Sequence, residues 1–189
     1  MAFLASRRLG KFGLGFNRRR TLAACLVLFS VLCLSAWLLD SVGQTWLELT
    51  DGETGRRILA QLLPGGERVV LTWTNSLFGL PVTEVFVAGN GALMLTEITF
   101  ADPAGREPPR VRPEDVDDLY HTGGPFKAEG LSRRFTRVTF RVGEIGNPTF
   151  RIDARVISLA REVGFGGSIL LTARPPTLRE RVKAAIRKR

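Results

Sequence analysis

The chain has few of the side chains that build catalytic and metal sites. Its 189 residues include two cysteines and one histidine. Both cysteines, Cys25 and Cys33, lie inside one uncharged apolar run, so the rest of the chain has no cysteine for a disulfide or a thiolate zinc site. A single histidine cannot build a multi-histidine metal site. The sequence therefore predicts neither a metal nor another cofactor.

Sequence motifs of common enzymes are missing as well. No glycine-rich phosphate-binding loop precedes a predicted helix, and no serine stands in a nucleophile elbow. We therefore expect a protein that is not an enzyme. The part that follows the apolar run, about 150 residues, is long enough to bury a core without disulfides.

Charge, glycine and proline are all absent from residues 21–39. A helix of this length spans about 28 Å, close to the roughly 30 Å of a bilayer core. The sequence thus predicts one uncleaved transmembrane helix. A cleaved signal peptide is the alternative, although the bulky residues Trp37, Leu38 and Leu39 close the run where such a peptide needs small ones.

The charges before the run predict its orientation. Residues 1–20 contain six arginines and lysines and no acid, and positive charge favours the cytoplasmic side of a first span. We expect a basic cytoplasmic leader at residues 1–20 and an extracytoplasmic domain after the helix. In a bacterium this describes a single-pass inner-membrane protein whose C-terminal domain lies in the periplasm.

The net charge of +9 comes from the two ends of the chain. Residues 174–189 hold seven basic residues and one acid, and the leader holds six basic residues. Of the 27 basic and 18 acidic residues, residues 21–173 keep 14 and 17. Because the expected domain is close to neutral, we predict a membrane protein without a nucleic-acid partner.

Residues 45–174 show short alternating runs separated by turn residues. In residues 67–75, for example, Val69, Leu71 and Trp73 share one face. The Gly89-Asn90-Gly91 turn predicts a hairpin between residues 82–88 and 92–100. The pattern predicts an all-β fold: a single antiparallel β-sandwich or small open barrel of about eight strands.

Three segments carry more detailed expectations. Residues 101–131 are rich in proline, glycine and charge, and we expect an irregular loop there with one helical turn at residues 113–119. Residues 133–142 and residues 150–159 each alternate like a single strand.

The chain closes on a basic segment, residues 177–189, which we expect to be a helix or a tail. Thr177 and Glu180 have the spacing of a capping box, and Leu178, Val182 and Ile186 fall on one helical face. Such a helix can lie on an anionic membrane surface. A frayed tail in solution is the alternative, and both stay open.

Candidate functional residues cluster around two segments. Asn75 and Ser76 precede a turn, and Pro81 and Glu84 follow it on the next predicted strand, so a hairpin can bring Asn75, Ser76 and Glu84 together. The alternative for this group is a hydrogen-bonded turn that fixes the register of the hairpin.

The only tyrosine and the only histidine, Tyr120 and His121, stand side by side in the long loop. We treat these two residues, with Asn75, Ser76, Pro81 and Glu84, as a candidate ligand- or partner-binding site.

A family resemblance rests on the same segment. Trp73-Thr74-Asn75-Ser76-Leu77, followed by Pro81-Val82-Thr83-Glu84, is similar to the most specific motif of the bacterial family known as domain of unknown function 1850, and Val163-Gly164-Phe165-Gly166-Gly167 resembles its end. The resemblance covers residues 47–174. Asn75 stands where the family has a histidine, and Leu77 where it has a valine.

The resemblance implies an accessory role at a membrane transporter. Members of that family are small, often anchored or exported, and associated with permeases of tripartite ATP-independent periplasmic (TRAP) transporters of the TAXI type. The implied partner is such a permease or its solute-binding protein. The alternative hypothesis is a small periplasmic hydrolase or ligand-binding enzyme that uses Ser76, Glu84 and His121.

Overall fold

The structure is a computed structural model that describes Leu22 and residues 25–32 and 43–187. The chain divides into two compact units, Met1–Asp40 and Ser41–Arg189. The predicted leader lies outside the described residues. Of the predicted span, Leu22 and residues 25–32 are described, and they are helical. Among the helices that the structure describes, none combines the length and the apolar character needed to cross a bilayer.

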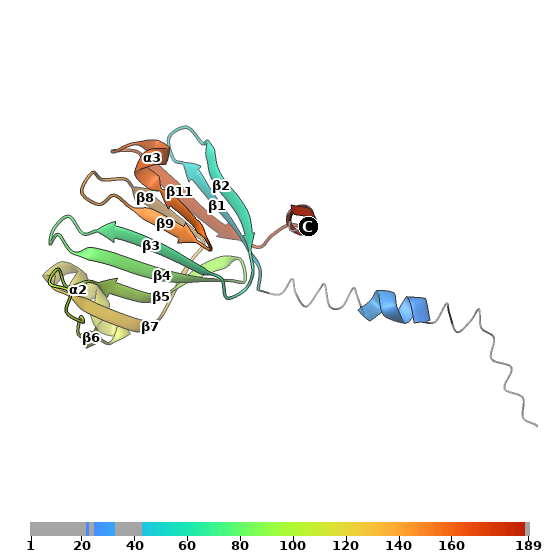
Figure 1. Cartoon of the computed structure of the whole chain (residues 1–189), viewed down its shortest axis with the longest axis horizontal. Helices are drawn as coiled ribbons and strands as arrows, with labels where there is room; N and C mark the ends of the chain where they lie inside the picture. Colours follow the sequence, from blue (N-terminus) through green and yellow to red (C-terminus); the bar gives the residue numbers. More distant parts are fainter. Residues whose placement is uncertain (1–21, 23–24, 33–42, 188–189) are drawn as a thin grey trace, which may run out of the picture. The chain divides into compact units, whose positions relative to one another are not determined.

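The second unit contains two separate β sheets (Figure 1). The first sheet has the strand order β2-β1-β11-β8, and the second has the order β10-β9-β3-β4-β5-β7-β6. The strands of the first sheet are β1 (Thr45–Asp51), β2 (Arg57–Leu63), β8 (Arg137–Arg141) and β11 (Ser168–Arg174). Those of the second are β3 (Arg68–Thr74), β4 (Pro81–Gly89), β5 (Ala92–Phe100), β6 (Arg110–Val111), β7 (Phe126–Phe135), β9 (Thr149–Ile152) and β10 (Arg155–Ser158).

Short helices complete the unit. Next to β6 lie the 3-10 helix η1 (Pro113–Asp115) and α2 (Val116–Thr122), and later in the chain come α3 (Leu159–Val163) and α4 (Leu178–Arg187). The described part is therefore mostly β, with helices at its periphery.

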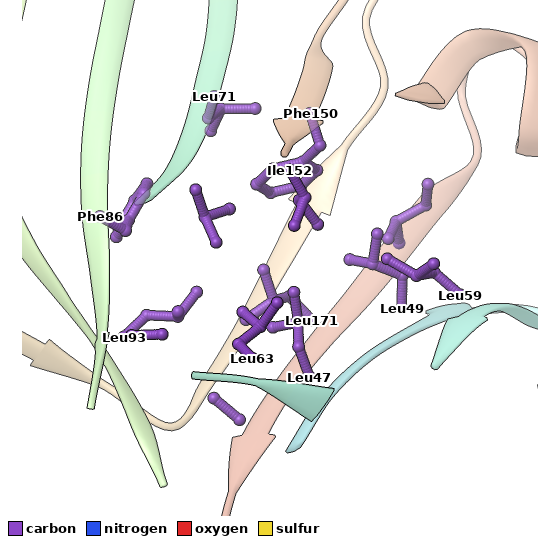
Figure 2. Packing of buried hydrophobic residues seen from close by; sticks show 14 of the residues in the cluster. Leu47, Leu49, Leu59, Leu63, Leu71, Phe86, Leu93, Phe150, Ile152 and Leu171 are labelled. Atoms are coloured by element: carbon purple, nitrogen blue, oxygen red, sulfur yellow. The ribbon is translucent and has the colours of Figure 1, made fainter. Parts of the chain in front are cut away.

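The main core is built by side chains from both sheets, which point toward one another in Figure 2. Strand β1 shows the cause, because every second residue, including Leu47 and Leu49, is fully buried. The first sheet contributes Leu47, Leu49, Leu59, Leu63, Ile169, Leu171 and Ala173, and the second contributes Val69, Leu71, Phe86, Leu93, Phe150 and Ile152 among others. Burying a leucine of this kind stabilises the fold by about 1.5–3 kcal/mol.

A second, smaller core lies between α2 and the second sheet. Val116 of α2 packs with Ile98 and Phe100 of β5 and Phe126 of β7. Tyr120 adds an edge-on contact with the Phe100 ring, whose centroid lies 5.1 Å away. This core fixes α2 beside β5 and β7 (Figure 1).

The beginning and the end of the second unit's β structure are joined at one end of the sheets. The Asn90 N–H donates to the Gly43 carbonyl at 3.0 Å, and the Gly91 N–H donates to Thr45 Oγ1 at 3.2 Å. A side chain at Gly91 would lie 2.3 Å from the nitrogen of Pro175. The β4–β5 turn therefore contacts the chain both before β1 and after β11, and we call this region the termini end.

Several details differ from the sequence expectations. The described residues form eleven strands instead of about eight, and β6 and β7 pair in parallel, so the second sheet is mixed and not purely antiparallel. The predicted hairpin is confirmed by the pairing of β4 with β5, and the helical turn by η1 and α2.

The predictions for the three segments were wrong in part. Residues 101–131, expected to be irregular, contain β6 and the start of β7, because Phe126 and Ala128 are buried against β5. Residues 133–142 are split at Thr136, where the chain passes from the second sheet to the first. Residues 150–159 form a hairpin, since Asp153 takes a positive φ of 54° and reverses the chain.

Candidate functional site

Asn75 builds the loop between β3 and β4. Its side-chain Oδ1 accepts the N–H groups of Leu77 at 2.9 Å and Phe78 at 3.1 Å. Its own N–H donates to the Leu80 carbonyl at 2.8 Å, and the Gly79 N–H donates to its carbonyl at 2.8 Å. The side chain is almost fully buried, so Asn75 acts as the internal support of an Asx-type turn.

This turn presents an exposed surface that we call the hairpin tip, residues 76–79. Ser76 is exposed, Leu77 is 79% exposed and Phe78 is 39% exposed. The ring of Phe78 lies directly against Gly123, where an added Cβ would come within 2.6 Å of it. The hairpin tip is thereby held against the C-terminal end of α2, where His121 is also exposed.

Glu84 lies on the inward face of β4. Val82 and Phe86, two residues away on either side, are both buried, and the cross-strand partners of Glu84 are Leu71 and Ile98. A carboxyl group among such neighbours is costly to bury unless it is hydrogen-bonded.

Two hydrogen bonds reach that carboxyl group. The Tyr120 hydroxyl donates to Glu84 Oε1 at 3.0 Å, and the Trp73 side chain also donates to the carboxylate. Burial raises the pKa of Glu84, and the two hydrogen bonds oppose that shift without cancelling it. Burial also raises the pKa of Tyr120, and the nearby charge of Glu84 raises it further, so the hydroxyl stays protonated as a donor.

Glu84 borders a cavity of about 260 Å³ where the two sheets face each other. Its lining combines apolar side chains with Glu84 and Arg141. Its lining residues are Leu71, Trp73, Glu84, Thr139, Phe140, Arg141, Gly146 and Pro148. A cavity of this size and composition suits a small molecule with an apolar body and one or two polar groups.

The structure brings together only some of the predicted site residues. Glu84 and Tyr120, which come from different segments, are hydrogen-bonded. Asn75 forms hydrogen bonds within its own loop, which agrees with the alternative prediction of a hydrogen-bonded turn. In the described part of the chain, neither Ser76 nor His121 lines the cavity of Glu84.

Pro81, the remaining candidate, is exposed at the start of β4. Opposite it, Thr74 ends β3, so Pro81 sits where the hairpin tip joins the sheet.

Trp73 and Arg141, which line the same cavity as Glu84, are not among the candidate residues that the sequence predicts. The signal for Trp73 was present, because Val69, Leu71 and Trp73 were placed on one face of the strand that pairs with β4. A glutamate between two apolar residues of an alternating strand is the signal for a buried carboxyl group. Arg141 comes from the other sheet, and strand alternation does not show which residues of two sheets line one cavity.

No group of three or more histidine, cysteine, aspartate or glutamate side chains that could hold a metal ion occurs within the described residues. No protein-family model matches the chain, and comparison with curated proteins and with solved structures also gives no match.

Proposed function

We propose that the protein is a membrane-anchored, periplasmic β-sandwich that serves as a non-catalytic accessory protein of a TRAP-type (TAXI) solute transporter in a bacterial inner membrane. The uncharged run at residues 21–39 and the basic leader support the anchor. The core shared by the two sheets supports the sandwich. The family resemblance of residues 47–174 supports the association with a transporter.

The observation that carries the partner-binding role is the hairpin tip. Leu77 is 79% exposed, yet the turn that presents it is fixed by the buried side chain of Asn75. A large apolar side chain that a rigid turn holds in solvent is suited to bind a partner, because it loses little conformational entropy on binding. The tip also lies within the segment that carries the resemblance.

The position of the hairpin tip favours the solute-binding protein as the partner. Strand β4 runs from Pro81, beside the tip, to Gly89, beside the termini end. Nine strand residues cover about 30 Å. Because the chain enters the domain at the termini end, the tip lies at the other end of β4 from that entry, which supports a partner in the periplasm over one within the membrane.

Site-specific photo-crosslinking tests this role. A photoreactive residue replaces Leu77 in one variant and Phe165, which is 59% exposed on another loop, in the control. Both are expressed with the permease and the solute-binding protein. We expect a covalent product with a transporter component at Leu77 and none at Phe165. Equal products at both positions, or none at Leu77, would contradict the proposal.

The role of Asn75 gives an independent check in the same assay. Asn75→Ala removes the acceptor for two backbone N–H groups of the turn, which costs about 1 kcal/mol or more. We expect weaker crosslinking from Leu77 in this variant, whereas Glu107→Ala, at an exposed position outside the hairpin tip, leaves it unchanged.

A second candidate function is binding of a small ligand in the cavity of Glu84. The cavity is lined by apolar side chains together with Glu84 and the exposed Arg141, and the Glu84 carboxyl group can accept a hydrogen bond from a small amine with an apolar body. Thermal unfolding with a panel of small primary amines and their alcohol counterparts tests it. Stabilisation by an amine, lost in Glu84→Gln, supports this function, and equal effects of amines and alcohols contradict it.

A further inference from the structure

Helix α4 presents an apolar stripe to solvent. Leu178, Val182 and Ile186 follow one another at a spacing of four residues, which places them on one face. They are 65%, 46% and 69% exposed. Within the described residues nothing covers this stripe, although apolar side chains in such a row normally pack against another surface.

The opposite face of α4 is fixed to the β domain. Glu180 forms a two-pronged ion pair with Arg174 at the end of β11, with distances of 2.9 Å from Nη1 to Oε2 and 2.6 Å from Nη2 to Oε1. The same carboxylate accepts the Thr177 N–H at 2.8 Å and caps the helix. Glu180 and Ala184 border a groove against β2. Ile186 also lines this groove, whereas Leu178 and Val182 do not, so the Leu178–Val182 part of the stripe points away from the domain.

Basic side chains stand beside the stripe. At 100° per residue, Arg179 and Lys183 fall on one side of it and Arg181 on the other. The only acid of the helix, Glu180, is already paired with Arg174. The exposed residues Arg179 and Lys183 thus stand beside an apolar stripe, as in helices that lie in the interface of an anionic bilayer, whereas Arg181 is half-buried with its Nε inside the domain.

Helix α4 lies at the termini end, where the chain enters the domain. Trp46 of β1 pairs with Arg174 of β11, and the Arg174 guanidinium lies 5.8 Å from the Trp46 ring centroid. Helix α4 begins four residues after Arg174. The predicted span ends at residue 39, and the six steps to Thr45 reach at most about 20 Å. The termini end cannot lie farther from the membrane than this.

We propose that α4 binds the periplasmic surface of the membrane in which the protein is anchored. Leu178, Val182 and Ile186 insert at the boundary of headgroups and acyl chains, and the exposed Arg179 and Lys183 contact the phosphates of anionic lipids. The helix holds the termini end on the bilayer and so sets the orientation of the domain. This inference rests on the proposed anchor.

The test uses the full chain in lipid nanodiscs with a single fluorophore. In a background of Cys25→Ala and Cys33→Ala, a cysteine replaces Val182, Leu28 or Phe165 and is labelled with an environment-sensitive dye. Leu28 reports on the anchor, and Phe165 is an exposed apolar residue near the opposite end of β11 from α4. Quenching by spin-labelled lipid is compared in phosphatidylcholine alone and in phosphatidylcholine mixed with phosphatidylglycerol.

We expect the dyes at positions 28 and 182 to be quenched in the mixed lipid and the dye at position 165 to stay unquenched. Quenching at position 28 without quenching at position 182 would overturn the inference and leave the anchor intact. Absence of quenching at position 28 would overturn the anchor and the inference together.

The dependence of quenching on lipid charge distinguishes binding of α4 to anionic lipid from mere closeness of α4 to the bilayer. Arg179→Gln and Lys183→Gln each weaken the attraction to anionic lipid, by about fivefold in the equilibrium between bound and free α4. We expect quenching at position 182 to fall in both variants, and also in phosphatidylcholine alone. Equal quenching at position 182 in both lipid compositions and in both variants would contradict the electrostatic part of the proposal.

Discussion

Replacement of Glu84 by glutamine changes the charge of the buried site and little else. The side chain keeps its volume and an oxygen that can accept the Tyr120 hydroxyl. Burial raises the pKa of Glu84 in the folded protein above the value of about 4.5 for an unperturbed glutamate. Below that value both states hold the proton. As pH rises, the unfolded chain loses its proton first, so Glu84 progressively destabilises the fold until pH passes the folded pKa.

The size of the effect follows from linkage. Each unit by which the folded pKa exceeds the unfolded pKa costs about 1.4 kcal/mol of stability once pH is above both values. Glu84→Gln removes this cost. We therefore expect the variant to gain stability relative to the wild-type protein as pH rises from 4 to 8, with no further gain above the folded pKa.

Tyr120→Phe tests the hydrogen bond itself. It removes the donor 3.0 Å from a buried carboxylate and lowers stability by about 1.5–3 kcal/mol at pH 8. The loss is smaller in the Glu84→Gln background, because a bond to a neutral amide is weaker than a bond to a charged carboxylate.

Urea unfolding of residues 41–189, which form a compact unit, measures these differences through tryptophan fluorescence. Glu107→Gln, at an exposed position, is the control and should follow the wild-type curve at every pH. The reasoning is refuted if the free energies of unfolding of Glu84→Gln and the wild-type protein run parallel between pH 4 and 8, or if the variant loses stability as pH rises.

Two further predictions concern the termini end and α4. Gly91→Ala and Gly55→Ala both place a side chain at a φ of +70°, but only the first meets Pro175, so Gly91→Ala should cost about 1–3 kcal/mol more in urea unfolding. The hydrogen bond from Arg174 lowers the pKa of Glu180 to about 2, so its contribution is present above about pH 4.5 and is lost as pH falls toward 2. Glu180→Gln should lower the helicity of α4 at pH 7 and make no difference near pH 2, as measured by NMR chemical shifts. The same loss of helicity at both pH values would count against the ion pair.

Alternating hydrophobicity was enough to predict the β class of the fold and the central hairpin. Leu47 and Leu49 alternate with less buried residues because one face of β1 meets the core. The alternation cannot show where a strand changes sheet. Residues 133–142 read as one strand, yet the Thr136 carbonyl accepts the Ala173 N–H at the point where the chain crosses between sheets.

The candidate site was predictable only where the chemistry is local. Asn75 has the residue type and position of a side chain that caps a turn, and the structure shows it doing so. The bond between Tyr120 and Glu84 joins residues 36 positions apart. It depends on how α2 packs against β5, which no spacing in the sequence reveals.

Protease accessibility of the full chain in spheroplasts tests the central claim of a membrane-anchored periplasmic domain. The protein carries a tag after Arg189, and its mass is read on the same gel. The account predicts an uncleaved chain, retained in the membrane pellet after carbonate extraction, whose tag is lost when protease is added outside. A tag protected until lysis would reverse the topology, and a shortened chain released from the pellet would show that residues 21–39 are a signal peptide and not an anchor.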